Sequence, residues 1–154
     1  MTTEEIEEKN VVTNRRARYE YFILESYEAG LALRGTEVKS LRAGSANLQD
    51  GYVMVRRGEL WLVGMHVSPF EKGNINNHDP LRDRKLLLHR KEIRKLTTKL
   101  QEKGLALIPL RVYFKKNIAK VEFGLCRGKK FFDKRETIRK RDVERQMRRD
   151  FAQS

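Results

Sequence analysis

The 154-residue chain has a single cysteine, Cys126, which excludes an internal disulfide and a zinc site built from several cysteines. It has only three prolines, and no apolar run approaches the roughly 20 residues that a membrane-spanning helix needs. Residues 1–10 are acidic, where a secretory signal would be basic and then apolar. From these absences we expect a soluble protein of the reducing cytoplasm, with no membrane association.

Acidic residues are also fewer than basic ones. The chain has 34 Lys and Arg residues against 21 Asp and Glu residues, which gives a formal net charge of +13 at pH 7. A positive field of this size attracts polyanions, and the counterions released from a bound polyanion drive association. Nucleic acid is therefore the first class of partner that the composition indicates.

Charge divides the chain into three segments. Residues 1–13 are net negative and have no periodic apolar face, so we expect a disordered lead-in. Residues 14–126 carry 22 basic and 12 acidic residues, and residues 127–154 carry 11 basic and 5 acidic ones. Because both of these segments are basic, we expect two basic surfaces, one on a folded domain (14–126) and one on a tail (127–154).

Strand and turn signals dominate the folded segment. β-Branched and aromatic residues separated by short turns indicate strands and hairpins, and apolar residues spaced three and four apart before Gly104 indicate a helix. Two prolines with several Gly and Asn residues indicate a loop over 68–80. The expected elements are strands 19–25 and 30–33, a short helix 36–44, a hairpin of 51–56 with 59–67, a helix 90–103, and a hairpin of 108–114 with 119–125.

This order of elements predicts a mainly β fold with inserted helices. Short strands with one longer helix between two hairpins suit an oligonucleotide-binding (OB) type barrel, which a disordered C-terminal tail would follow. A split α+β sandwich is the open alternative.

The titratable residues give no sign of catalysis. His66, His78 and His89 show no His-x-x-x-His spacing and no neighbouring pair of carboxylates, so we expect solvated or packed histidines. Cys126 follows an apolar strand and is expected to be a small buried residue. We therefore expect no enzyme activity, no metal and no cofactor.

Basic runs with aromatic neighbours favour RNA. Arg15, Arg16 and Arg18 lie beside Tyr19 and Tyr21, and a second basic run spans 82–95. Such runs are often only solvated faces, but neutralised phosphates release counterions, and arginine can stack on exposed bases.

An extended segment, Leu86, Leu87 and Leu88, precedes the longer helix. Side chains alternate between the two faces of an extended chain, so Leu87 points away from the other two. We expect Leu86 and Leu88 in the core, and Leu87 against an unstacked base.

Several stretches, taken in order, resemble the bacterial SsrA-binding protein family, also called small protein B. No single stretch is decisive, but the ordered set with this length and basic tail is highly specific. The stretches are 14–18 (NRRAR), 27–33 (YEAGLAL), 35–42 (GTEVKSLR), 79–80 (DP) with 84–89 (RKLLLH), and 128–130 (GKK) with 133–135 (DKR).

The resemblance implies an OB-type barrel that binds the transfer-RNA-like domain of transfer-messenger RNA. It places the family's RNA-contacting carboxylate on Glu28 and its apolar contact on Leu87, and His89 stands where some relatives have asparagine. A carboxylate can accept hydrogen bonds from base amino and imino groups, which Lys and Arg cannot do. The expected RNA-binding residues are Asn14, Arg15, Arg16, Arg18, Glu28, Lys39, Arg42, Arg84, Lys85, Leu87, His89, Arg90 and Lys91.

The resemblance also implies a tail that acts inside the ribosome, in the empty messenger channel near the decoding site. Val143, Met147 and Phe151 recur four apart, a stripe too short for a stable free helix, so we expect a tail that is disordered when free and helical on the ribosome. The expected tail contacts are Gly128, Lys129, Lys130, Asp133, Lys134, Arg135, Ile138, Val143, Met147 and Phe151.

The implied function is an adaptor of trans-translation, a monomer that meets GTP-bound elongation factor Tu through the RNA complex and rescues stalled ribosomes. Two other classes compete with it. A general OB-type RNA chaperone would not select folded over unstructured RNA, and a nuclease using histidine and lysine would cleave it.

Overall fold

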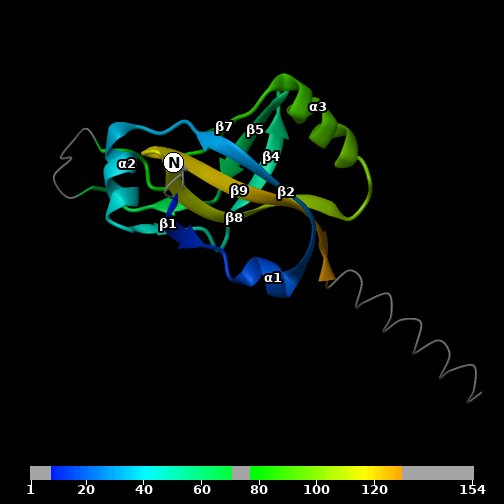
Figure 1. Ribbon diagram of the computed structural model, residues 1–154, viewed down its shortest axis with the longest axis horizontal. Helices are drawn as coiled ribbons and strands as arrows, with labels where there is room; N and C mark the ends of the chain where they lie inside the picture. The colour runs from blue at the N-terminus through cyan, green and yellow to red at the C-terminus, as the bar shows by residue number, and fades with distance from the viewer. Residues whose placement is uncertain (1–7, 71–76, 130–154) are drawn as a thin grey trace, which may run out of the picture.

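The computed structural model describes residues 8–70 and 77–129 (Figure 1). Strands prevail over helices, which confirms the mainly β prediction with inserted helices. The elements are β1 (Glu8–Thr13), α1 (Arg16–Glu20), β2 (Tyr21–Leu31), α2 (Gly35–Arg42), β3 (Ala46–Asn47), β4 (Tyr52–Arg56), β5 (Glu59–Val63), β6 (His66–Val67), β7 (Arg84–Leu87), α3 (Arg90–Lys99), β8 (Leu105–Lys115) and β9 (Ile118–Gly128).

The strands form one large antiparallel sheet in the order β1-β8-β4-β5-β7-β2-β9, and β9 also pairs with β8. From β8 the pairing therefore passes through β4, β5, β7, β2 and β9 and returns to β8. The strands β3 and β6 form a separate two-stranded sheet. The helices lie at different ends of the strands, with α3 at the top of the view, α2 at the left and α1 at the bottom (Figure 1).

Two-residue turns join the hairpins that the sequence predicts. Arg57 and Gly58 connect β4 to β5 with φ of 52° and 73°, and Lys116 and Asn117 connect β8 to β9 with φ of 51° and 65°. Positive φ at both central residues gives a turn whose twist matches that of the flanking strands. The hairpin of 108–114 with 119–125 is confirmed. The hairpin of 51–56 with 59–67 is confirmed as far as Val63, because 66–67 form the separate strand β6, which pairs with β3.

The core lies between the strands and α3. Leu60 and Leu62 of β5 are fully buried, as are Val121 and Phe123 of β9, because alternate side chains of each strand face inward. Helix α3 adds Ile93 and Leu96 from one face, in agreement with the predicted spacing. The helix ends at Lys99, four residues before the predicted end.

Three further predicted boundaries were wrong. Residues 19–25 and 30–33 were expected to form two strands, but 21–31 form the single strand β2, and Tyr19 belongs to α1. Residues 8–13 form β1 instead of a disordered lead-in, since they pair with β8, and Glu8 binds Arg111 at 3.1 Å. The folded domain also extends past 126, because Arg127 and Gly128 pair with β2.

Candidate RNA-binding groove

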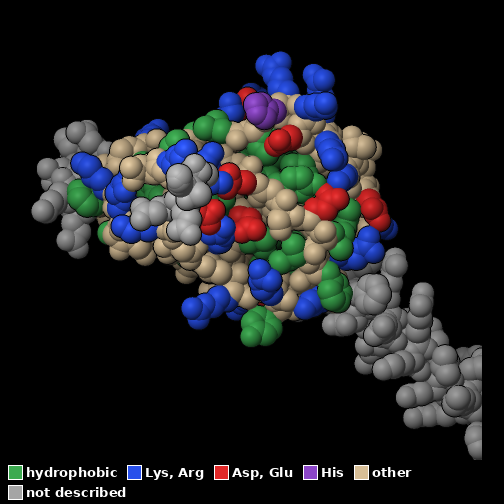
Figure 2. Space-filling view, in the orientation of Figure 1, with side chains coloured by type: hydrophobic (Ala, Val, Ile, Leu, Met, Phe, Trp, Pro, Cys, Tyr) green, Lys and Arg blue, Asp and Glu red, His purple; other side chains and the backbone are tan. Residues whose placement is uncertain are grey.

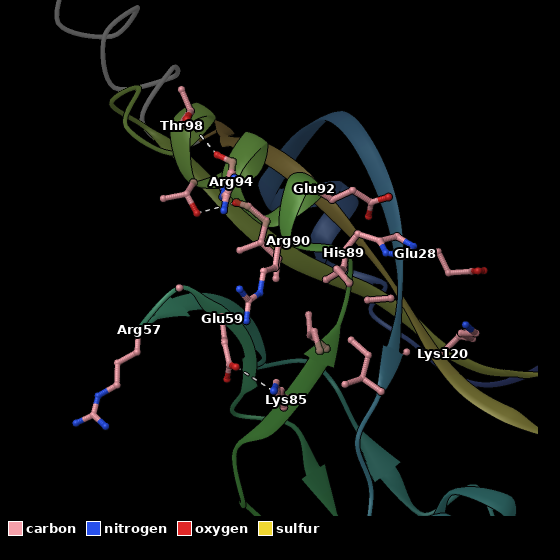
Figure 3. Close-up of a pocket in the computed structure, with 18 residues that line it drawn as sticks. Glu28, Arg57, Glu59, Lys85, His89, Arg90, Glu92, Arg94, Thr98 and Lys120 are labelled. Atoms are coloured by element: carbon pink, nitrogen blue, oxygen red, sulfur yellow. Dashed lines mark hydrogen bonds and ion pairs between the residues drawn. The ribbon is translucent and has the colours of Figure 1, made fainter.

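A groove of about 1220 Å³ opens between α3, the end of β7, the C-terminal end of β2 and the β4–β5 turn (Figure 3). A smaller hollow of about 240 Å³ lies elsewhere on the described part of the chain. Five predicted RNA-binding residues line the groove, namely Glu28, Lys85, Leu87, His89 and Arg90. The fold therefore brings together residues that lie up to 62 positions apart in the sequence.

The floor of the groove includes an exposed leucine. Leu87 is 52% exposed, whereas Leu86 is 1% exposed and Leu88 packs against the core. This alternation agrees with the prediction for the three leucines. Gly30 lies opposite Leu87 in the β2–β7 pairing, so no side chain from β2 covers the leucine at that point. An exposed apolar side chain between charged walls can contact the face of an unstacked base.

Basic side chains line the walls. His89 is the N-cap of α3, and Arg90 and Arg94 project from the exposed side of that helix. Arg90 extends toward the β5 side of the groove (Figure 3). Lys85 on β7 binds Glu59 on β5 at 3.0 Å, and both side chains stay about two-fifths exposed. Arg90, Arg94 and Lys85 can contact phosphates along the groove.

Glu28 on β2 is the predicted discriminating carboxylate, and it is held by donors from β8. The hydroxyl of Tyr113 and the Nζ of Lys115, at 3.4 Å, both donate to Glu28 Oε2. The Tyr113 hydrogen bond holds the pKa of Glu28 below its usual range, against partial burial, and Lys115 adds to this effect. Glu28 is therefore ionised at neutral pH and can only accept hydrogen bonds.

The structure contradicts the predicted role of Arg84. This arginine was expected to contact RNA, but its side chain is 0% exposed, and its Nε donates to Glu37 Oε2 at 2.6 Å. Its two other guanidinium nitrogens donate to the carbonyls of Met65, at 2.6 Å, and Pro80, at 3.2 Å. The alternation that exposes Leu87 in β7 also turns Arg84 inward, so the pattern in the sequence could have revealed it.

The structure also contradicts the predicted RNA contact of Asn14. This asparagine is 6% exposed, and its Nδ2 donates to the carbonyl of Pro109 at 3.0 Å, so it anchors the start of α1 to β8. Together with Arg16 it lines a hollow of about 240 Å³ that shares no residue with the groove. Arg15 is the N-cap of α1 and Arg18 lies within it; both are exposed, at the end of the molecule opposite α3 (Figure 1).

Lys39 and Arg42 lie on α2, and neither lines the groove. The Lys39 ammonium lies 5.4 Å from the ring centre of Phe70, and the Arg42 guanidinium lies 4.6 Å from that of Phe114. Both residues are exposed, so their charges stay available at the surface. Lys91 is exposed on α3 but also lies outside the groove lining. The space-filling view shows Lys and Arg spread around the rim and Asp and Glu gathered nearer the middle of this face (Figure 2).

Of the predicted tail residues, two lie in the described part of the chain. Gly128 ends β9, and Lys129 Nζ donates to the carbonyl of Arg18 at 2.8 Å and lies 5.0 Å from the ring centre of Phe22. The other predicted tail contacts lie outside the described residues, as does the predicted state of the free tail. They are Lys130, Asp133, Lys134, Arg135, Ile138, Val143, Met147 and Phe151.

The groove also contains residues that the sequence analysis did not select. Arg57 follows from the predicted hairpin turn, which had to lie at an end of the strands, and Glu59 comes two residues later. Lys120 has no local signal, because only the β2–β9 register places it opposite Gly30. Within residues 8–70 and 77–129, no cluster of His, Cys, Asp and Glu could hold a metal ion, and no helix could cross a membrane.

Comparison with known proteins places the chain among close relatives. Residues 11–153 match the family model described as SmpB protein. The SsrA-binding protein of Desulforudis audaxviator is 63% identical over 142 residues, which cover 92% of this chain and 93% of that protein. The SsrA-binding protein of Pelotomaculum thermopropionicum is 60% identical over 141 residues, which cover 92% of each chain.

A solved structure described as "tmRNA-SmpB: a journey to the center of the bacterial ribosome" matches the fold. Its TM-score is 0.65 at 52% sequence identity, and the match covers 77% of this chain and 84% of that one.

Proposed function

The chain belongs to the SmpB protein family, and we propose that it is an RNA-binding adaptor of trans-translation. In this proposal the groove binds the transfer-RNA-like domain of transfer-messenger RNA, and the protein delivers that RNA to stalled ribosomes. The SsrA-binding relatives and the matched tmRNA–SmpB ribosome structure support both partners. The protein would have no catalytic role.

The observation that carries the proposal is the composition of the groove. An ionised carboxylate, Glu28, and an exposed leucine, Leu87, stand among several cations. Cations attract any phosphate backbone, whereas a carboxylate accepts only from base and sugar donors, and a leucine contacts only an unstacked base. Folded RNA with exposed loop bases offers phosphates, hydrogen-bond donors and unstacked bases together, and a duplex does not.

We also propose that the large sheet is an OB-type barrel. The pairing that leads from β8 through β4, β5, β7, β2 and β9 back to β8 supports this, since a closed circuit of pairing is what defines a barrel. The groove then lies on the outer surface, where α3 follows β7.

The remaining parts of the proposal rest on the sequence. The tail enters the empty mRNA channel near the decoding site, where its basic residues meet phosphates and its apolar stripe orders on binding. The protein acts in the cytoplasm as a monomer and meets elongation factor Tu only through the RNA complex.

A comparison of Glu28→Gln with Glu102→Gln tests the groove. Both variants lose one negative charge, but Glu102 binds Arg127 at 2.9 Å and does not line the groove. We expect Glu28→Gln to lower the preference for the transfer-RNA-like domain over random RNA about 10-fold, and Glu102→Gln to leave it unchanged. The measurement is a filter-binding titration of each variant with both RNAs at one salt concentration.

Equal preference in both variants would remove Glu28 from recognition. Binding of the random RNA as tightly as the transfer-RNA-like domain by the wild-type protein would favour a general RNA chaperone. Cleavage of either RNA would favour a nuclease.

A second experiment separates RNA binding from action on the ribosome. Deletion of 131–154 should leave RNA binding nearly intact, as should Lys134→Ala with Arg135→Ala, and each should abolish peptide tagging of stalled ribosomes in a reconstituted translation system. Met147→Asp with Phe151→Asp should do the same, because the apolar face would be lost. Tagging at the wild-type rate by both of the substituted tail variants would refute the role of the tail.

A further inference from the structure

Glu28 is held in place by a residue two strands away. The β2–β9 register sets Glu28 opposite Glu122, and the β9–β8 register sets Lys120 opposite Tyr113. Tyr113 reaches from β8 past β9, and its hydroxyl donates to Glu28 Oε2. Among the described residues both donors to Glu28, Tyr113 and Lys115, bind Oε2, and none binds Oε1. One carboxylate oxygen is thus held by the protein, and the other can accept from a ligand.

The tyrosine itself has little freedom. Tyr113 is 1% exposed, and the guanidinium of Arg111 lies 3.9 Å from its ring centre. Arg111 in turn binds Glu122 at 2.7 Å and Glu8 at 3.1 Å. Burial and the Glu28 carboxylate raise the pKa of Tyr113 well above its usual range, so the hydroxyl keeps its proton and always donates. The ring has a fixed position, and the direction of its hydrogen bond is fixed as well.

We propose that Tyr113 is the positioning residue for Glu28, and that Arg111 fixes the Tyr113 ring. The inference rests on the proposed function of the groove. Tyr113 holds the carboxylate in one rotamer, with Oε1 free to accept from an RNA base. Without this hydrogen bond a partly exposed glutamate samples several rotamers, and RNA binding has to order it at an entropic cost. Tyr113 therefore raises the selectivity of the groove without touching RNA.

A second tyrosine–glutamate pair on the same strand supplies a matched control. The Tyr27 hydroxyl donates to Glu25 Oε2, and Lys99 Nζ donates to the same oxygen at 2.6 Å. Neither Tyr27 nor Glu25 lines the groove. Tyr27→Phe and Tyr113→Phe thus remove the same atom from the same kind of pair, and only Tyr113→Phe affects a groove residue.

The experiment is a double-mutant cycle of Tyr113→Phe with Glu28→Gln, read out as the preference for the transfer-RNA-like domain over random RNA. We expect Tyr113→Phe to lower the preference about 3- to 10-fold, and the double variant to equal Glu28→Gln alone, because Tyr113 acts through Glu28. Tyr27→Phe should change nothing. The second readout is the Glu28 side-chain carboxyl signal in ¹³C NMR, whose titration midpoint should rise in Tyr113→Phe, since a donor to the ionised form is lost.

Two results would overturn the proposal. Additive losses in the cycle would mean that Tyr113 acts by general stabilisation, and an unchanged Glu28 midpoint would mean that the hydrogen bond does not hold the carboxylate. If Tyr113→Phe does not fold, Arg111→Gln enters the same cycle, because it frees the ring and keeps the hydroxyl. If Glu28→Gln itself keeps full preference, the proposed function of the groove fails first, and the two failures stay distinguishable.

Discussion

Removing Arg84 should destabilise the fold and leave the RNA-binding surface in place. The guanidinium is enclosed, with Glu37, the Met65 carbonyl and the Pro80 carbonyl as acceptors. Glu37 caps the start of α2 by accepting from the Arg34 backbone N–H at 2.8 Å, and it also binds Arg82. Arg84 therefore joins α2, β7 and the connection between β5 and β6 at Met65 from inside the protein.

The size of the effect follows from what the substitution leaves behind. Breaking a buried ion pair by removing one partner costs about 3–5 kcal/mol, because the other charge stays buried without its counterion. Arg82 still neutralises Glu37 in part, which lowers the cost, but the Met65 and Pro80 carbonyls each lose a donor, at about 1–3 kcal/mol for a buried group. We expect Arg84→Ala to lower the free energy of unfolding by about 4 kcal/mol, a large part of the roughly 5–15 kcal/mol of an ordinary domain.

Urea denaturation followed by circular dichroism measures this loss, and Lys85→Ala is the control. Lys85 is next in sequence but faces outward, and its exposed pair with Glu59 contributes about 0–1 kcal/mol. Lys85→Ala should therefore keep its stability and lose RNA affinity, while folded Arg84→Ala should keep its affinity. An Arg84→Ala protein within 1 kcal/mol of wild type that binds RNA weakly would refute the reasoning and return Arg84 to the RNA interface.

Acid titration gives a second test of the same pair. Burial raises the pKa of Glu37, but the hydrogen bonds from Arg82, the Arg34 backbone and Arg84 outweigh it, so the pKa lies below its ordinary value of 4.5. The stability from the ionised form is thus complete above pH 4.5 and is lost as the pH falls through the folded-state pKa. Glu37→Gln should be less stable than the wild type at neutral pH and should lose less stability on acidification. The measurement is the midpoint of urea unfolding of both proteins at neutral pH and at acidic pH.

Four further outcomes are expected. Gly64→Ala should cost about 1–3 kcal/mol in thermal unfolding, because φ is +83° and a Cβ would lie 2.6 Å from the Asp50 carbonyl oxygen, whereas Gly58→Ala, with open space around it, should cost about 1 kcal/mol. Leu96→Ala should cost about 2–5 kcal/mol by the same measurement, because the side chain is fully buried. Cys126 is buried and its pKa is raised to about 11 by desolvation, so a thiol reagent at pH 8 should modify it only after unfolding. RNA affinity should fall with salt at a log–log slope of about −0.7 to −0.9 per phosphate contacted, and a flat response would contradict the role of the basic walls.

Local chemistry was enough to predict several features of the fold and the site. The hairpins β4–β5 and β8–β9 could be placed from sequence, because short turns such as Arg57-Gly58 separate runs of β-forming residues, and the positive φ of the turn residues agrees with this. The position of Leu87 in an extended run decided its exposure, because alternation is a property of the strand itself. The order of family-like stretches indicated the family that the relatives then showed.

Strand β1 and the role of Arg84 depended on distant partners. Residues 8–13 have no apolar alternation, and they form a strand because β8 offers a free edge and Arg111 offers a cation to Glu8. Arg84 carries the same charge as Lys85, and only Glu37, 47 positions earlier in the chain, makes a buried guanidinium tolerable.

The sequence by itself determined the charge, the hairpins, the helix α3 and the side chains that could contact RNA. The tertiary structure decided which of them meet, since the register of β2 with β9 and of β9 with β8 brings Lys120 to the groove and the Tyr113 hydroxyl to Glu28. Local propensity acts over a few residues, whereas register depends on which distant strand buries its inner face best. That is why Lys85 and Arg90 could be predicted from local sequence, whereas Lys120 and the tyrosine that holds the carboxylate of the groove could not.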